Sequence, residues 1–253
     1  MSVVVAAIGD SAETGPVTEL ARVLADLLGA EVQAIHVEEA DTASEPIAFA
    51  PLRRIPFRRP PGNVADAIAT AVKERNPLVV VLGSGGASSP AAPAGHVTME
   101  LVQLLDVAVA VVPLQAHPRP INRVLVAVEG DGESHALRRL VRDLRHRPEV
   151  DLVALHVFEP DQLPLFGDQP VLETEAWTEE FGRRMLRRTE RAVQLEVRVG
   201  DAGRSLCETA TELDVDLVVI AWHRNLSRGH GRLVRTMLAE TDRPIVLFPL
   251  ARD

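Results

Sequence analysis

The chain of 253 residues carries 27 lysine and arginine residues against 36 aspartate and glutamate residues, a formal net charge of -9. This charge disfavours nonspecific nucleic-acid binding, and an aromatic content of 3% without tyrosine leaves few platforms for stacking bases. A single cysteine excludes an internal disulfide framework, and no apolar run reaches the roughly 20 residues that span a bilayer. We therefore expect a cytoplasmic protein with neither membrane nor nucleic-acid partners.

Taken in chain order, the predicted elements occur twice. Residues 3–112 and 122–248 each read as a strand, a helix, a strand ending in His-Val, a glycine-led helix, a strand, a last helix and a final strand. A repeat of this length indicates duplication of a whole domain, because solenoid repeats are much shorter. We predict two homologous domains, residues 1–115 and 121–253, joined by a short linker whose two prolines make it fairly stiff.

The predicted strands are continuous apolar runs without the alternation of a sheet that has one wet face. They include VVVAAI, LVVVLG and VAVAVV in the first repeat and RVLVAV, DLVVIA and PIVLF in the second. Such strands are buried on both faces, and helical stripes such as Val17, Leu20 and Leu24 lie between them. The pattern predicts an α/β fold with a Rossmann-like, doubly wound, parallel five-stranded sheet in each domain.

The two repeats differ between their second and third strands. The second repeat has a long insertion there, residues 158–191, and the charged stretch Glu173–Ala192 at its end is predicted to form a helix. The first repeat has only residues 38–52 at this place, rich in proline and alanine, and we predict a loop. Arginines and glutamates share the predicted helix, which favours a solvated face with paired charges.

Several motifs together resemble the universal stress protein family. They are the stretch from Val197 to Leu206, the strand from Asp214 to Ala221, the two His-Val strand ends at His36 and His156, and the closing segment from Arg243 to Pro249. The resemblance covers the chain as a tandem pair. It implies strand order 3-2-1-4-5 in each domain, with the last strands meeting so that a pseudo-twofold axis inside the chain replaces a homodimer. A further homodimer stays open.

The resemblance also implies where a nucleotide would bind. Nucleotide-binding members carry an aspartate after the first strand and, after the fourth, the pattern Gly-x-x-Gly, nine residues and Gly-Ser/Thr. Glycines let backbone amides approach phosphates, and the helix that follows favours an anion at its N-terminus. The first domain departs from this pattern, because Gly95 comes one residue early, His96 replaces Ser/Thr, and Gly9 stands at the aspartate position. Its candidate residues for ATP or AMP are Gly9, Asp10, Ser11, Val37, Gly83, Ser84, Gly85, Gly86, Gly95 and His96.

The second domain departs further from the family pattern. Its loop after the fourth strand lacks both opening glycines, and Glu129 would crowd a nucleoside. The loop is nevertheless the most cationic in the chain and precedes a predicted helix, so it could hold phosphate or an acidic metabolite. The candidate anion-binding residues are Glu129, Val157, His223, Arg228, Gly229, His230, Gly231 and Arg232. For both loops, a purely connecting role remains the alternative.

Other chemistry is weakly supported by the sequence. The histidines form no helical pair with a carboxylate, so we expect no metal site, and we expect backbone-bonding or core roles for His36 and His156. Cys207 has no neighbouring cluster of histidines and is predicted to be a buried structural thiol. The favoured function is a non-catalytic stress-response or regulatory binding module with a degenerate adenine-nucleotide site. The alternatives are an interaction protein that binds no nucleotide and a weak nucleotide hydrolase.

Overall fold

The computed structural model describes residues 2–9, 14–38, 53–58, 64–85, 93–128, 135–144, 146–158, 193–226 and 231–250. The first half of the fold contains β1 (Val3–Ile8), α1 (Thr14–Leu28), β2 (Glu31–Glu38), β3 (Arg53–Arg58), α2 (Val64–Arg75), β4 (Val79–Gly83), α3 (His96–Leu104) and β5 (Ala108–Val112). The second half contains β6 (Arg123–Ala127), α4 (His135–Asp143), β7 (Asp151–Phe158), β8 (Gln194–Val199), α6 (Ala202–Glu212), β9 (Leu217–Trp222), α7 (Arg232–Glu240) and β10 (Ile245–Pro249).

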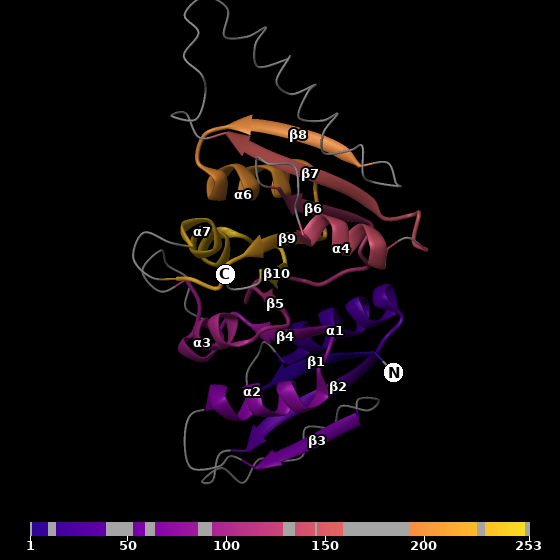
Figure 1. The fold of residues 1–253 in the computed structure, drawn as a ribbon, viewed down its shortest axis with the longest axis vertical. Coiled ribbons are helices and arrows are strands. Elements are labelled where there is room, and N and C mark those ends of the chain that lie inside the picture. The colour runs from indigo at the N-terminus through magenta and orange to yellow at the C-terminus, as the bar shows by residue number, and fades with distance from the viewer. Residues whose placement is uncertain are drawn as a thin grey trace, which may run out of the picture.

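All ten strands form one continuous sheet, in the order β3-β2-β1-β4-β5-β10-β9-β6-β7-β8. Figure 1 shows this ladder running from β3 at the bottom to β8 at the top. Neighbouring strands within each half are parallel, and β5 pairs with β10 antiparallel, with Val111 opposite Ile245. The predicted order 3-2-1-4-5 and the meeting of the fifth strands are confirmed. The two predicted sheets are joined by backbone hydrogen bonds into one.

Helices cover both faces of the sheet, as the continuous apolar strands predict. One core layer lies beneath α1 and α4, and the other lies beneath α2, α3, α6 and α7. Successive residues of β4 alternate between the layers, with Val79 and Val81 in the first and Val80 and Leu82 in the second. Because both faces are covered, every residue from Val79 to Leu82 is buried.

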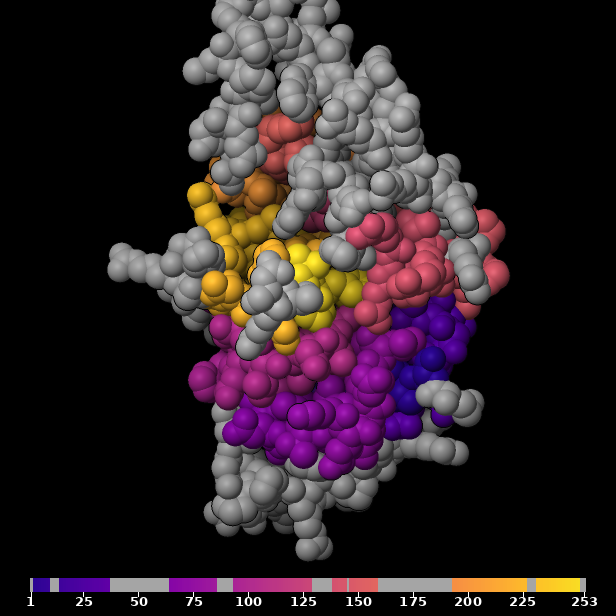
Figure 2. All heavy atoms as spheres, viewed as in Figure 1, coloured from indigo at the N-terminus to yellow at the C-terminus, as the bar shows by residue number. Residues whose placement is uncertain are grey.

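Two arginines of the second half also reach across to helices of the first. Arg147 donates to the carbonyl oxygen of Asp26 in α1 at 2.5 Å, and Arg224 donates to that of Leu105 at the end of α3 at 3.3 Å. Carbonyl groups in the last turn of a helix lack intrahelical partners, and cations there also interact favourably with the helix dipole. Figure 2 shows the two halves in contact, the first coloured indigo to magenta and the second salmon to yellow.

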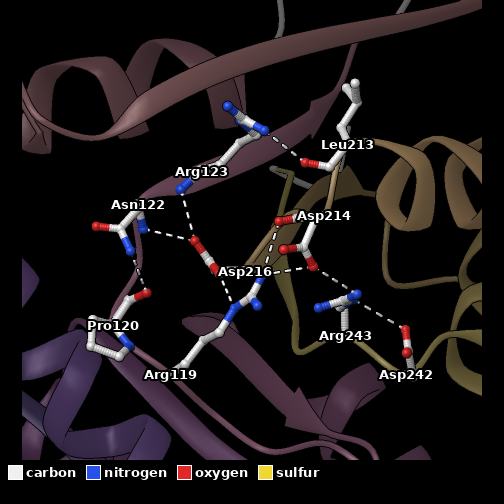
Figure 3. Close-up of polar contacts among 9 residues, drawn as sticks. All are labelled: Arg119, Pro120, Asn122, Arg123, Leu213, Asp214, Asp216, Asp242 and Arg243. Carbon is white, nitrogen blue, oxygen red and sulfur yellow. Dashed lines mark hydrogen bonds and ion pairs between the residues drawn. The ribbon is translucent and has the colours of Figure 1, made fainter.

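The linker between the halves is held against the amino ends of β6 and β9. Asp216 accepts hydrogen bonds from the backbone amides of Asn122 at 2.8 Å and Arg123 at 2.9 Å, and from the guanidinium group of Arg119 (Figure 3). Its side chain is only 4% exposed. Arg119 also pairs with the carboxylate of Asp214 at 2.9 Å, and this hydrogen bond lowers the pKa of that carboxyl group. The linker is therefore a fixed part of the fold.

Some predictions lie outside the described residues. The predicted helix Glu173–Ala192 lies outside them, as does the predicted loop of the first half beyond residue 38. Within the described parts of the chain, no helix has both the length and the apolar character that crossing a membrane would require.

Candidate functional site

The candidate site of the first half lies where the order of the strands reverses. The chain passes from β1 outward to β2 and β3, and then returns to the other side of β1 as β4 and β5. Ligands of open parallel sheets bind at such a point, beyond the carboxyl ends of the strands. Here Gly9 follows β1, and Ser84 and Gly85 follow the adjacent strand β4. The topology therefore brings together two groups of predicted residues that are distant in sequence.

The loop after β4 is closed at its base by contacts between its two ends. The amide of Gly95 donates to the carbonyl oxygen of Ser84 at 2.6 Å, and the hydroxyl group of Thr98 donates to that of Gly83 at 2.7 Å. Gly85 has a φ of +79°, and a Cβ added there would lie 2.8 Å from the Cα of Gly95. Both positions require glycine, because a side chain at either one would collide with the backbone of the other.

Gly95 is one of the predicted nucleotide-binding residues, and its amide is bonded within the loop in this structure. The donors that fit an anion here belong to the first turn of α3, since Gly95 is the N-cap and no side chain of the described residues caps this helix. His96 is the first residue of the helix, and its side chain is 88% exposed. Its Nε2 lies 3.5 Å from Oε2 of Glu100.

At the opposite side of the site, His36 at the end of β2 is buried. Its Nδ1 lies 3.1 Å from the carbonyl oxygen of Ile8, the last residue of β1. This contact confirms the expected backbone-bonding role. Gly9 follows Ile8, and a Cβ added to Gly9 would meet nothing within 4 Å. Among the described residues, nothing fills the position that a side chain at Gly9 would take, beside the end of β1.

The other predicted residues of this site are described only in part. Val37 lies in β2 and pairs with Phe57 in β3. Asp10, Ser11 and Gly86 lie outside the described residues. The structure brings Gly9 and the loop from Gly83 to His96 to the same end of the sheet.

The equivalent end of the second half is filled differently. His156 makes the same contact as its counterpart, with Nδ1 3.0 Å from the carbonyl oxygen of Val128. The ring of Phe158 packs edge-on against the His156 ring, with centroids 4.4 Å apart. Glu38 occupies the corresponding position of the first half, so no aromatic residue stands at that position there. Val157 lies in β7 opposite Arg198, and Glu129 lies outside the described residues.

Two arginines of the cationic loop in the second half already contact other groups of this chain. Arg232 forms an ion pair with Asp201 at 2.7 Å, and Arg224 extends to the first half, as described above. Gly231 is the N-cap of α7 with a φ of +62°, and a Cβ there would lie 2.6 Å from the carbonyl oxygen of Asn225. His223 is exposed, whereas Arg228, Gly229 and His230 lie outside the described residues.

Two contacts in this region were not predicted from the sequence. Neither the partner of Arg232 nor the reach of Arg224 across the halves was expected. An aspartate that begins a helix, as Asp201 does with its side chain bonded to the Arg204 amide, is a recognisable N-cap. Its second contact, with Arg232, depends on how α6 packs on α7 and has no signal in the sequence.

The single cysteine and the potential metal ligands concern two further sequence-based expectations. Cys207, predicted to be buried, is half-buried in the structure, and this partial burial raises the pKa of its thiol to about 11. Its Sγ lies 3.5 Å from the sulfur of Met237. A thiol with a raised pKa is a poor nucleophile at neutral pH. Among the residues that the structure describes, no three histidine, cysteine, aspartate or glutamate side chains gather as metal ligands.

Comparison with known proteins identifies similar chains. The sequence model of the universal stress protein family matches residues 120–246. No curated protein matches the sequence. A provisionally assigned universal stress protein from Pseudomonas aeruginosa UCBPP-PA14 has a TM-score of 0.72 at 14% identity, covering 98% of this chain and 93% of that one. A universal stress protein from Archaeoglobus fulgidus DSM 4304 has a TM-score of 0.66 at 14% identity, covering 98% and 96%.

Shorter solved chains match about half of this one. One is a universal stress protein in complex with cAMP, and another is the universal stress protein from Archaeoglobus fulgidus in complex with dAMP. They are 17% identical to this chain, with TM-scores of 0.36 and 0.35. Likenesses at this level are too weak to place a ligand in this chain.

Proposed function

The chain belongs to the universal stress protein family, and we propose that it is a non-catalytic binding module that holds an adenine nucleotide in its first half. We propose residues 1–115 and 121–253 as its two domains. The nucleotide, ATP or AMP, lies beyond the carboxyl ends of β1 and β4. The phosphates meet the N-terminus of α3, and the nucleoside lies beside Gly9.

The observation that carries this proposal is the convergence of Gly9 and the closed loop from Gly83 to His96 at the switch point between β1 and β4. The closure of Gly85 on Gly95 holds the first turn of α3 in a fixed place. Within the part of the chain that the structure describes, no side chain caps this helix, so its first turn offers amide donors and a favourable dipole to a phosphate. An exposed imidazole, His96, stands at the same turn.

The second half offers a poorer site for a nucleotide. Its histidine ring is covered by Phe158, and the arginine that begins α7 is paired with Asp201. We therefore propose one nucleotide per chain, with the second half serving as the structural partner of the first. A phosphate in the second half would have to compete with the Asp201 carboxylate for Arg232.

Thermal unfolding with AMP, ATP and inorganic phosphate tests the proposal, because a ligand that binds only the folded state raises the unfolding midpoint. Two matched variants locate the site. Gly85→Val and Gly231→Val each place a branched side chain at a positive φ against backbone atoms, one in each half. We expect the nucleotide-induced rise to disappear in Gly85→Val and to persist in Gly231→Val.

The alternatives give different results in the same experiment. A protein that only makes structural interactions shows no rise with any nucleotide. A rise that is lost only in Gly231→Val moves the site to the second half. Release of phosphate from ATP by the wild type, abolished in Gly85→Val, would make the protein a hydrolase.

A further inference from the structure

One ring nitrogen of His36, at the edge of the proposed site, lacks a hydrogen-bond partner among the residues that the structure describes. The side chain is buried, with 3% exposed, and its Nδ1 is 3.1 Å from the carbonyl oxygen of Ile8. A carbonyl oxygen can only accept, so Nδ1 carries the proton in this contact. In the neutral ring, the remaining nitrogen, Nε2, is then a hydrogen-bond acceptor.

That acceptor has no hydrogen-bond partner among the described residues. A buried polar group left unpaired destabilises the folded state, so such groups in folded proteins call for an explanation. Strand alternation puts His36 on the same face of the sheet as Ala34, which packs in the core layer beneath α1. The hydroxyl oxygen of Thr18 in α1 is also buried without a partner there. Two polar groups that have no partner in the described part of the chain thus lie on the α1 side of the sheet.

The surroundings of His36 distinguish it from its counterpart in the second half. His156 makes the same bond to the end of its neighbouring strand, but Phe158 packs against its ring. Beside His36, the residue after its carbonyl partner is Gly9, which has open space where a side chain would be. The first half therefore combines a buried acceptor with room at the adjacent strand end.

From these observations we infer that His36 Nε2 is the specificity contact of the site and accepts a hydrogen bond from a donor group of the bound nucleoside. This inference rests on the proposed function and names the chemistry that the site selects. Because Nδ1 donates to the Ile8 carbonyl oxygen, Nε2 can only accept a hydrogen bond. Its partner is therefore a donor group of the nucleotide, either a ribose hydroxyl group or the exocyclic amino group of adenine. Because His36 Nε2 is buried, the groups that cover it must move aside when a nucleoside binds.

A matched pair of variants isolates this contact. His36→Asn keeps an amide that can donate to the Ile8 carbonyl in place of Nδ1, but it has no atom at the position of Nε2. His156→Asn makes the same change in the second half. By calorimetry with AMP, we expect about tenfold weaker binding in His36→Asn, as for one lost hydrogen bond, and a change below about twofold in His156→Asn.

Nucleotide analogues identify the donor. The 2′-deoxy and 3′-deoxy forms of AMP each lack one hydroxyl group, and purine riboside monophosphate lacks the amino group. The analogue that binds equally well to wild type and His36→Asn lacks the group that contacts His36. If His36→Asn fails to fold, the 15N shift of His36 Nε2 in the wild-type protein decides instead, and we expect AMP to move it.

The possible outcomes separate the two proposals. If AMP binds wild type and His36→Asn equally and leaves the Nε2 shift unchanged, this inference is wrong, a buried water molecule is the simplest occupant, and the proposed function stands. If each analogue loses the same affinity relative to AMP in wild type and in His36→Asn, Nε2 accepts no hydrogen bond from any of the groups removed. The inference is again wrong in that case. If AMP binds none of the proteins, the inference and the proposed function both fall.

Discussion

Removing the Asp216 carboxylate should destabilise the second half of the fold. Asp216 holds the linker through two backbone amides and the Arg119 guanidinium group, with its side chain 4% exposed. Each hydrogen bond to a charged group contributes about 1.5–3 kcal/mol. Arg119 and Asn122 are exposed, so water can replace some of these contacts. We expect Asp216→Ala to lower the free energy of unfolding by about 2–4 kcal/mol.

Urea unfolding followed by circular dichroism at pH 7 measures this loss. Asp216→Asn keeps one acceptor oxygen and should lose less than the alanine variant. Asp151→Ala is the control, because Asp151 forms an exposed ion pair with Arg123 at 3.3 Å and should contribute no more than about 1 kcal/mol. A loss in Asp216→Ala no greater than that in Asp151→Ala would refute the reasoning.

Three further predictions follow from single contacts. Gly85→Ala should lower the free energy of unfolding by about 2 kcal/mol, because it adds a side chain at positive φ against backbone atoms. Gly9→Ala should change the free energy of unfolding by less than about 0.5 kcal/mol. Urea unfolding measures both, and the opposite ranking would contradict the loop geometry. Cys207 should react slowly with a disulfide reagent at pH 7.5, and the rate should keep rising towards pH 11; a plateau near the ordinary thiol pKa of about 8.5 would contradict its burial. The hydrogen bond from Arg119 lowers the pKa of Asp214, so its stabilisation is present above the unfolded value of about 3.9 and is lost as the pH falls through the folded pKa. The difference in urea midpoint between wild type and Asp214→Asn should therefore shrink from pH 7 to pH 3, and a constant difference would count against the pair.

The fold could be predicted from the sequence because its signals are local and occur twice. Runs such as Val79–Leu82 are apolar at every position, which is compatible only with burial on both faces. The pairing of β5 with β10 followed from the family resemblance, since a tandem chain brings the two final strands together. The division at residues 115 and 121 stays a prediction.

The candidate site was less predictable, because its roles depend on contacts between distant residues. A glycine pattern suggests approach to a phosphate, yet Gly85 and Gly95 approach each other. A cluster of cations suggests an anion, yet the Asp201 carboxylate already pairs with Arg232. Nothing in the sequence around Asp216 indicates that it binds the linker, since that contact exists only when β9 lies beside β6.

The most direct test of the nucleotide site is a crystal structure of the full chain grown with excess AMP. The account predicts one nucleotide, beyond the carboxyl ends of β1 and β4, with its phosphate at the first turn of α3 and its nucleoside beside Gly9. The corresponding end of the second half, beside Val128, should hold none. A nucleotide bound in the second half alone, or none in either half at saturating AMP, would contradict the account.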